Sequence, residues 1–576
     1  MGFKTLSVFL RHWRDGEMEL PTQSFSRLNR ILEFEFGEAI PASQMDVLNI
    51  CLLFDYKAMS YDFLEYLGIS GLESFFGNTI ERLARHSLIE TRLPDRQSVT
   101  FSLSELLYQF LRQSATVWHS VVRRAASLLA EKVPRSHKDN YRERIELLAP
   151  HAVMFSKYIH TTQKSVTGSA EFLDNLERIA SLLRLLDKDV DAIKLYGLIH
   201  QENAKLPSSM QLTPLRTAEV YNNMGLSCMN EGDMKLAHSC FEKAAHALPT
   251  KESPETRLQI IANTARSLME MEEYATAVIL LSATLESNQS TDKVLLVPLQ
   301  HALGFTHVQL GRADLGIPLL EECRSVSESE HQRVGKRVIF TIMHDLATAW
   351  RDQKKWDDAI ILYEKVKECR ESFHGHTHRY TMETAGALAV AYQGSGQLVQ
   401  AAVCFKKALK WQCERLRLNH PDTLQTLQNY GIYLSMTGDL EGAKKALHLA
   451  HTGWVDQDRK IKKMTWNRIN SGVSLALVLQ DLADFNEAER LYRTALKWYR
   501  EPKVKENPRM TYRYSKTVYL SGRMYEIAGR ACLARMRYEE ATNVSMADND
   551  EASYWKCLSI RAMHNLKPAE GKVESF

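Results

Sequence analysis

Prolines, glycines and net charge are scarce in this sequence, and it has no long apolar run. The 15 prolines and 26 glycines among 576 residues are too few for a collagen-like or low-complexity chain. No apolar run approaches the roughly 18 residues that a membrane helix needs, so we expect no membrane contact. The 73 basic residues nearly balance the 70 acidic ones, and the resulting net charge of +3 disfavours nucleic acid as a partner of the whole chain.

The cysteine pattern indicates a reducing compartment. Nine cysteines are scattered from Cys51 to Cys557, and none forms a Cys-x-x-Cys pair. An odd and dispersed set of this kind favours free thiols over a disulfide framework or a zinc site. The apolar segment Val8–Leu10 is too short for a secretory signal because Arg11 follows it directly. We therefore expect a cytoplasmic chain.

Motifs that carry catalysis or bind nucleotides are also missing. No Gly-x-Ser-x-Gly nucleophile motif occurs. A phosphate-binding loop needs Gly-x-x-x-x-Gly-Lys followed by Ser or Thr. At Gly335–Lys336, Glu330 stands in place of the first glycine and Arg337 in place of the hydroxyl residue. We expect no enzyme, no catalytic residue, no cofactor and no metal site.

An internal repeat dominates the sequence from about residue 172 onward. Each copy has a small residue, a second small residue twelve positions later, and a bulky residue four positions after that. Small residues let two helices cross closely, and a bulky residue fills the gap to the next copy. The copies are Ala180-Ala192-Tyr196, Gly225-Ala237-Phe241, Ala265-Ala277-Leu281, Gly304-Gly316-Leu320, Ala347-Ala359-Tyr363, Ala389-Ala401-Phe405, Gly431-Ala443-Leu447, Ala476-Ala488-Tyr492 and a degenerate Gly529-Ala541-Ser545.

The copy from Tyr221 to Pro249 resembles a tetratricopeptide repeat, which is a pair of antiparallel helices. The motif His420-Pro421-Asp422-Thr423 resembles the kinesin-light-chain variety of this repeat, and we expect Asp422 or Thr423 to cap the helix that follows. The resemblance covers residues 172–545 and implies an all-α superhelical solenoid of eight or nine hairpins. A convergent helical array of another type is the alternative.

The N-terminal third has a different pattern. It indicates three short helices, then two strands around the turn Pro94–Gln97, then a helix capped by Ser104 with Glu105. This order resembles the winged helix of STAND-type receptors with NB-ARC domains, where a winged helix, an α+β module, lies between the nucleotide-binding domain and the repeats. The expected helices and strands are residues 45–52, 60–67, 72–86, 87–93 and 98–103.

The resemblance implies that the chain is the C-terminal portion of such a receptor and lacks its nucleotide-binding domain. The family often has Met-His-Asp where this sequence has Leu103-Ser104-Glu105, so the histidine that senses the nucleotide phosphate is replaced by serine. The expected parts are a helical remnant, a winged-helix-like domain, a helical connector, the repeat solenoid, and a C-terminal helix with a disordered tail, at residues 1–43, 44–113, 114–171, 172–545 and 546–576.

Two further clusters suggest other chemistry. His374, His376 and His378 are spaced so that their imidazoles can share a transition metal, but no cysteine or carboxylate completes a zinc set, and an ordinary inter-repeat loop is the alternative. Residues 79–145 carry twelve basic and seven acidic residues, a net charge of about +5, which favours a DNA-binding regulator as the alternative function. The expected recognition helix, Leu72–Leu83, is poor in side chains that read bases.

The concave surface of the repeats is where we expect function. First helices line this surface in tetratricopeptide arrays, with side chains one turn apart. Asn223, Asn263 and Asn429 fall at equivalent positions and can bond both backbone groups of an extended peptide, although bonds to neighbouring helices are the alternative. The predicted peptide-groove residues are Asn222, Asn223, Met229, Asn263, Arg266, His344, Asp345, Arg351, Gln428 and Asn429.

These patterns together predict a non-enzymatic scaffold or adaptor. Its partner is a protein or peptide bound in the groove, and a homo-oligomer is compatible with the sequence. The resemblance to STAND-type proteins implies the sensor or effector-binding half of a signalling protein.

Overall fold

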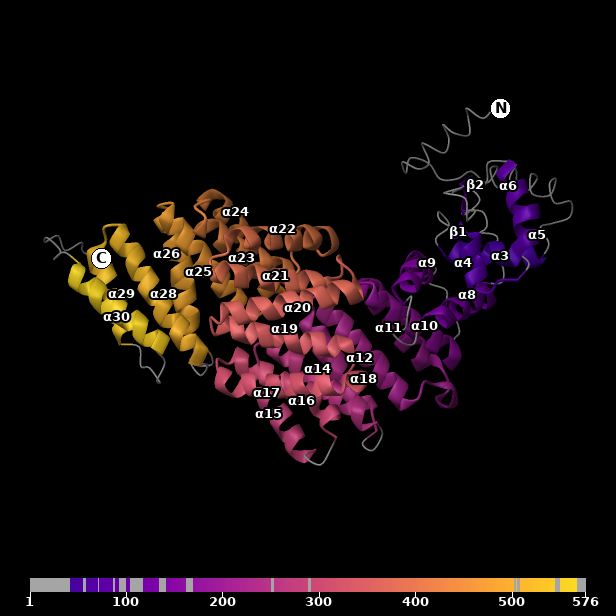
Figure 1. Ribbon diagram of the computed structural model, residues 1–576, viewed down its shortest axis with the longest axis horizontal. Coiled ribbons are helices and arrows are strands. Elements are labelled where there is room, and N and C mark those ends of the chain that lie inside the picture. Colours follow the sequence, from indigo (N-terminus) through magenta and orange to yellow (C-terminus); the bar gives the residue numbers. More distant parts are fainter. Residues whose placement is uncertain are drawn as a thin grey trace. The chain divides into compact units, whose positions relative to one another are not determined.

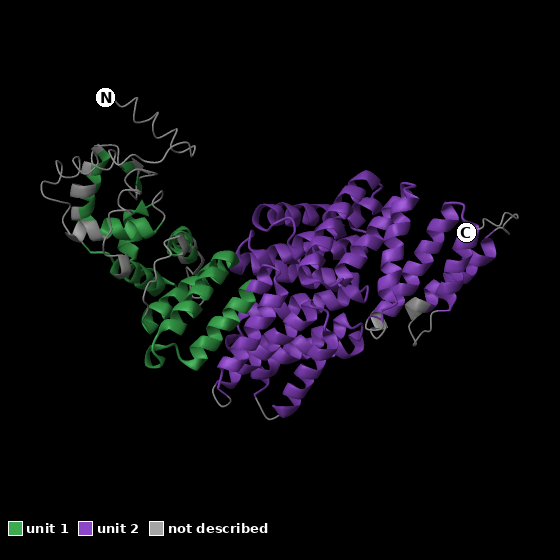
Figure 2. Cartoon of the chain, turned by 180° about the vertical axis from the view of Figure 1, so that it is seen from behind, with its two compact units in different colours: residues 1–227 green, residues 228–576 purple. Residues whose placement is uncertain are grey.

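The computed structural model describes residues 42–54, 59–70, 72–85, 89–92, 100–103, 118–133, 141–161, 169–249, 253–288, 292–501, 504, 508–543 and 550–566. The chain divides into two compact units, residues 1–227 and residues 228–576 (Figure 2). In the described parts, helices account for all regular structure except three short strands (Figure 1). No helix within those parts combines the length and the apolar character that crossing a bilayer requires.

The first part of unit 1 combines short helices with a small antiparallel sheet. The strands β1 (Met59–Ser60), β2 (Ile89–Arg92) and β3 (Thr100–Leu103) lie in the order β1-β3-β2. Ile89 pairs with Leu103, which confirms the predicted pairing of these two segments. The surrounding helices are α3 (Ala42–Leu53), α4 (Tyr61–Tyr66), α5 (Leu72–Ser74), the π-helical turn η1 (Phe75–Ile80), α6 (Glu81–Arg85), α8 (Trp118–Lys132) and α9 (Tyr141–Thr161).

The predicted single helix at 72–86 is interrupted by η1. Gly77 and Asn78, which are poor helix formers, fall inside this turn. Phe75 and Leu83 are almost fully buried, so the expected recognition helix contributes its apolar face to the core of unit 1. Residues 1–41, the helix expected after Ser104, and the tail after Leu566 lie outside the described residues.

Pairs of antiparallel helices follow one another along residues 169–543. Each pair is joined by a short turn, and α18 (His331–Val334), η2 (Ser208–Met210) and the last described helix α30 (Asp550–Asn565) lie outside this pattern. The pairs are α10–α11 (Ala170–Leu185, Asp189–Lys205), α12–α13 (Pro214–Asn230, Met234–Ala247), α14–α15 (Pro254–Glu270, Tyr274–Ser287), α16–α17 (Lys293–Gln309, Ala313–Ser329), α19–α20 (Lys336–Asp352, Trp356–His374), α21–α22 (Arg379–Gly394, Leu398–Arg415), α23–α24 (Pro421–Met436, Leu440–Ile461), α25–α26 (Trp466–Asp481, Phe485–Tyr499) and α28–α29 (Pro508–Ile527, Ala531–Thr542).

Small residues lie where the two helices of a hairpin cross, as the repeat pattern predicts. A Cβ added to Gly316 would lie 2.5 Å from the carbonyl oxygen of Gly304 on the facing helix. A Cβ added to Gly431 would lie 2.6 Å from the side chain of Leu447. The bulky residues of the pattern, such as Tyr363 and Phe405, are fully buried. The spacing of small and bulky residues in the repeat therefore corresponds to contacts between the two helices of each hairpin.

The last hairpin corrects one of the predicted sets. The small residues of α28 and α29 are Gly522 and Ala534, and the bulky residue is Tyr538, which is fully buried. A Cβ on Gly522 would lie 2.7 Å from the ring of Tyr538. The predicted Gly529 instead ends α28 in a left-handed turn with φ +73°. The set Gly529-Ala541-Ser545 was wrong because this turn glycine has no role in the crossing.

The expected caps of α23 are also corrected. The side chain that caps this helix is His420, whose Nδ1 accepts from the backbone N–H of Asp422 at 3.2 Å. Asp422 pairs instead with Arg379, at 2.8 Å between Oδ2 and Nη2. The hydroxyl of Thr423 is buried. His378 caps α21 in the same way, through the N–H of Tyr380 at 3.3 Å. The imidazole is thus the capping group of this repeat motif.

Candidate functional site: the inner surface of unit 2

In unit 2, turns that connect helices contact the starts of helices far away in the sequence. The turn after α12 meets the start of α23, where His420 Nε2 donates to the carbonyl oxygen of Asn230 at 2.7 Å. A Cβ added to Gly232 in that turn would lie 2.6 Å from Pro421. Lys235 Nζ also donates to the carbonyl oxygen of Ile461 at 2.6 Å. His420 therefore caps its own helix through one ring nitrogen and bonds a distant turn through the other.

The next hairpin repeats this contact. The turn after α14 meets the start of α25, where Glu272 Oε1 accepts from the backbone N–H of Trp466 at 2.7 Å. Lys463 Nζ donates to the carbonyl oxygen of Met271 at 2.7 Å. In both cases the partners belong to hairpins five places apart in the series. The superhelix of unit 2 therefore completes a turn in about five hairpins, and its successive turns are bonded together.

The carboxyl group of Glu272 makes this contact sensitive to pH. Burial raises its pKa to about 7, although the N–H of Trp466 and the charge of Lys463 act in the opposite direction. The folded value lies above the unfolded value of about 4.3, so the folded chain binds this proton more tightly. We expect stability to fall as pH rises from about 4.3 to about 7, and to change little through this group above that.

Denaturant midpoints at pH 5 and pH 8 measure this effect. The difference between the two midpoints should shrink in Glu272→Gln. It should persist in the control Glu273→Gln, because Glu273 is exposed. If the midpoint difference between pH 5 and pH 8 were unchanged in Glu272→Gln, the carboxyl group of Glu272 would not cause the pH dependence of stability.

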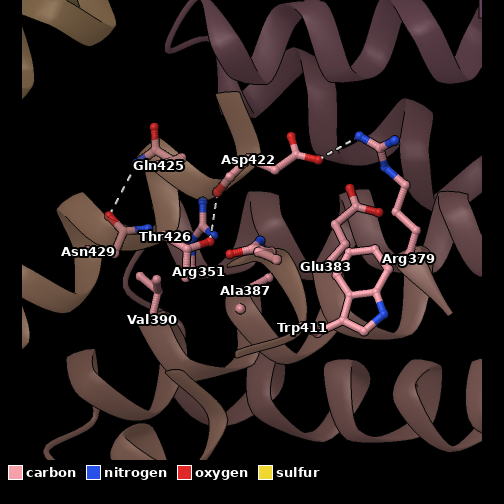
Figure 3. A pocket seen from close by; sticks show the side chains of 12 residues that line it. Arg351, Arg379, Glu383, Ala387, Val390, Trp411, Asp422, Gln425, Thr426 and Asn429 are labelled. Carbon is pink, nitrogen blue, oxygen red and sulfur yellow. Dashed lines mark hydrogen bonds and ion pairs between the residues drawn. The ribbon is translucent and has the colours of Figure 1, made fainter. Parts of the chain in front are cut away.

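A pocket lies inside this turn of the superhelix (Figure 3). It encloses about 170 Å³. Its lining comes mainly from the first helices of three consecutive hairpins, α19, α21 and α23, which pack side by side, with two residues from α22. The lining residues are Arg351, Arg379, Glu383, Gly386, Ala387, Val390, Trp411, Gln412, Asp422, Gln425, Thr426 and Asn429.

Most charges in the pocket are already matched within the chain. Arg379 pairs with Asp422, and Arg351 Nη2 lies 2.9 Å from Asp352 Oδ1. Burial would raise the pKa of Asp422, but the charges of Arg379 and His420 lower it below its usual value. Glu383 lies 3.6 Å from the buried Arg370, and its side chain is 50% exposed. Glu383 is therefore the pocket carboxylate that is least committed to a partner.

Carboxylates from several helices face the same interior. The pKa of Glu270, at the end of α14, is raised by burial and then by the charges of Asp422, Glu383 and Asp345, while Arg266 lowers it. These acids belong to α14, α19, α21 and α23. Acidic side chains of four first helices thus act on one another electrostatically in this turn.

A buried charge network lies beside the pocket. Asp345 Oδ2 lies 2.8 Å from His301 Nε2 of the preceding hairpin, and Asp345 Oδ1 lies 3.3 Å from His344 Nδ1. All three residues are less than 10% exposed. Burial would raise the pKa of Asp345, but the hydrogen bonds from both histidines hold it well below its usual range. This network ties α16 to α19.

The predicted groove residues fall into four groups. Arg351 and Asn429 line the pocket. His344 and Asp345 belong to the buried network, and Asn263, Gln428 and the partly buried Arg266 and Met229 lie elsewhere on the first helices of unit 2. Asn222 and Asn223 lie in unit 1, where Asn223 Nδ2 donates to Glu177 Oε1 at 3.1 Å.

Two of the predicted asparagines share one local arrangement. Gln425 Nε2 donates to Asn429 Oδ1 at 3.2 Å, and Gln259 Nε2 donates to Asn263 Oδ1 at 3.2 Å. In the second pair Asn263 is only 2% exposed, whereas Gln259 is exposed. Gln428 is 1% exposed as well, so it does not face the pocket. Of these amides, Gln425 and Asn429 are the ones that reach the pocket.

Sequence reasoning missed most of the pocket lining. Arg379, Glu383 and Asp422 lie in the first turns of their helices, whereas the projection was centred on the small residues further along. A usable signal was present, because Glu383 and Gln425 both stand six positions before the first small residue of their copy. Trp411 and Gln412 belong to a second helix, which the projection assigned to the outside.

The histidines of the 374–378 segment have local roles. The rings of His374 and His378 stack with 4.3 Å between centroids, and His378 caps α21. His376 is exposed and lies 3.3 Å from a carboxylate oxygen of Glu371. Among the described residues, no group of three or more potential ligands converges on one point.

Two stretches match the tetratricopeptide repeat, at residues 218–245 and 338–411. The second stretch covers the hairpins α19–α20 and α21–α22, which carry most of the pocket. Together with the paired helices and their small-residue crossings, these matches show that the chain contains tetratricopeptide repeats. No curated protein matches it.

Several solved structures are similar in part. Kinesin-light-chain repeats from Podosopora anserina are 22% identical and cover 35% of this chain and 96% of their own, with a TM-score of 0.28. A Rap protein complexed with competence and sporulation factor is 13% identical over 68% of this chain and 99% of its own, with a TM-score of 0.45. A STAND protein with a tetratricopeptide sensor from Pyrococcus horikoshii is 13% identical over 78% and 68%, with a TM-score of 0.33. Similarity at this level carries no argument about the ligand.

Proposed function

We propose that this chain is a protein-interaction scaffold whose inner surface in unit 2 binds a segment of another polypeptide. Tetratricopeptide repeats typically serve as interaction scaffolds. The pocket gives the site its specificity, and the neighbouring first helices extend the surface along which the bound segment lies. The nine free thiols fit the cytoplasmic location that we also propose.

The observation that carries this proposal is the composition of the pocket. It joins partly exposed amide groups with a small apolar floor, and its lining comes from consecutive repeats. The bond between Gln425 Nε2 and Asn429 Oδ1 orients both side chains (Figure 3). Gln425 Oε1 can accept from the N–H of an extended peptide, and Asn429 Nδ2 can donate to its C=O.

Removal of both amides should weaken ligand binding. Peptides are first selected from a displayed random-sequence library on the full chain, and their affinities are then measured by fluorescence anisotropy. Because two hydrogen bonds contribute about 1 kcal/mol each, the double variant Gln425→Ala and Asn429→Ala should bind about thirtyfold more weakly. Its thermal melt should match that of the parent.

The control is Gln400→Ala, an exposed residue on the second helix α22. It should bind like the parent chain. Equal affinity of the double variant and the control would place the binding site elsewhere.

For unit 1 we propose a winged-helix-like module that belongs to the sensor half of a STAND-type protein. The antiparallel pairing of β2 with β3 after α6 supports the module. We expect it to serve as a protein-contacting module. Retention of the full chain on duplex DNA at low salt, lost at high salt, would favour the DNA-binding alternative instead.

A further inference from the structure

The floor of the pocket leaves room for an aliphatic chain. It is formed by Gly386, Ala387 and Val390 of α21 and by the buried Trp411 of α22. A Cβ built on Gly386 would meet nothing closer than Thr426 Oγ1 at 3.8 Å and Ala408 Cβ at 3.9 Å. These are ordinary contact distances, so the missing side chain of Gly386 leaves room for about one methyl-sized group between the glycine, Thr426 and Ala408.

An acceptor atom beside this floor has no donor within the described chain. Gln412 is 4% exposed, and its Oε1 atom is buried without a hydrogen-bond partner. A buried acceptor left in this state costs about 1–3 kcal/mol. Gln412 lines the pocket, so an N–H donor carried in by a ligand would satisfy it.

The charges at the pocket favour a cation among such donors. Both arginines of the lining are engaged by acids, Arg351 by Asp352 and Arg379 by Asp422. Glu383 keeps a half-exposed carboxylate at the edge of the pocket, with the buried Arg370 at 3.6 Å.

Other guests fit the lining less well. A ligand carboxylate would approach Glu383 and the carbonyl oxygen of Gln412 with no arginine released to meet it. A purely apolar side chain would fill the floor and leave Gln412 Oε1 without a donor. A lysine or arginine covers the floor with its methylene stem and carries donors at its tip.

We propose that the pocket is a subsite for a basic side chain of the bound polypeptide, with Gln412 Oε1 and Glu383 as the acceptors of its terminal N–H groups. This subsite rests on the proposed function, since it names the chemistry of a residue in the ligand that the inner surface binds. The amide pair Gln425–Asn429 then holds the backbone of the same segment.

The test combines changes in the ligand with changes in the pocket. Peptides selected on the full chain from the displayed random library are sequenced, and one is synthesised with its basic residue kept, replaced by norleucine, or replaced by glutamate. Affinity is measured by fluorescence anisotropy for the parent, Glu383→Gln and Gln412→Leu. The control is Glu368→Gln, an exposed acid on α20.

The selected peptides should share a lysine or arginine at one position. On the parent and on the control, norleucine at that position should weaken binding about tenfold, and glutamate should weaken it further. On Glu383→Gln the loss on going to norleucine should shrink to about twofold, because the partner charge is already gone.

Each failure has a distinct meaning. Peptides that bind without a shared basic residue, or whose basic residue contributes equally on the parent and on Glu383→Gln, would overturn the subsite and leave the proposed function standing. A library that yields no binder would overturn the proposed function itself.

Discussion

Gly316→Ala should destabilise unit 2 by about 3 kcal/mol, as overpacking of a tightly packed interior does. The added Cβ would lie 2.5 Å from the carbonyl oxygen of Gly304, 2.7 Å from Val308 Cγ2 and 3.0 Å from the backbone nitrogen of Val308. Two of these three atoms belong to the backbone of α16, so relief requires the two helices of the hairpin to separate. Separation would also strain the buried network that ties α16 to α19.

The matched control is Gly197→Ala in α11, which makes the same chemical change on another second helix. A Cβ on Gly197 meets nothing within 4 Å. Alanine has the higher helix propensity, so this variant should gain up to about 1 kcal/mol. Denaturant midpoints together with hydrogen exchange resolve both effects, and exchange in Gly316→Ala should rise first in α16 and α17. If both variants changed stability alike, close helix crossing would not explain the repeat.

Asp345→Asn should cost about 2–3 kcal/mol, because it removes the charge from a buried network without changing its volume. Asp345 serves His301 and His344 through separate carboxylate oxygens, at 2.8 Å and 3.3 Å. An amide has one oxygen, so one imidazole would face an NH₂ group in place of an acceptor. Asparagine has the same shape as aspartate, so the loss of stability in Asp345→Asn measures the removed charge and the missing acceptor.

The pH dependence of this loss has a defined sign. The two histidines hold the pKa of Asp345 below its usual value. Its stabilisation is therefore complete above the unfolded pKa of about 3.9, and it is lost as pH falls below that value. The gap between the parent and Asp345→Asn should be full at pH 7 and should narrow below pH 4. Asp358→Asn, an exposed acid on α20, is the control. A gap of equal size at pH 3 and pH 7 would contradict the network.

The helix pairs and their crossings could be predicted from the sequence because both are local properties. The spacing of small and bulky residues fixes which faces of two consecutive helices meet, and Gly304 with Gly316 shows that the contact is real. The same logic failed at the last hairpin, where the turn glycine Gly529 was taken for the crossing glycine Gly522. Composition alone does not separate these two uses of glycine.

The inner pocket could not be predicted in the same way. It depends on the rotation between successive hairpins, which sets how the first helices α19, α21 and α23 lie side by side. Accumulated over five hairpins, the same rotation brings Asn230 and His420 into contact. A small change in that rotation would open the turn, and the repeat spacing carries no information about it. The ion pair between Arg379 and Asp422 joins neighbouring hairpins and follows from the same rotation. The equivalent asparagines led to Asn429, but the glutamine that orients it was missed.

The most direct test of the inner surface is site-specific photo-crosslinking to the ligand. A p-benzoylphenylalanine is placed in the full chain at Val390, which lines the pocket, or at Val403, which is 64% exposed on the second helix α22. Each chain is irradiated with a selected, labelled peptide at a saturating concentration. The inner position should form the covalent adduct and the outer position should not. An adduct at Val403 with none at Val390 would show that the polypeptide binds the outside of the repeats, and would contradict the function proposed for this fold.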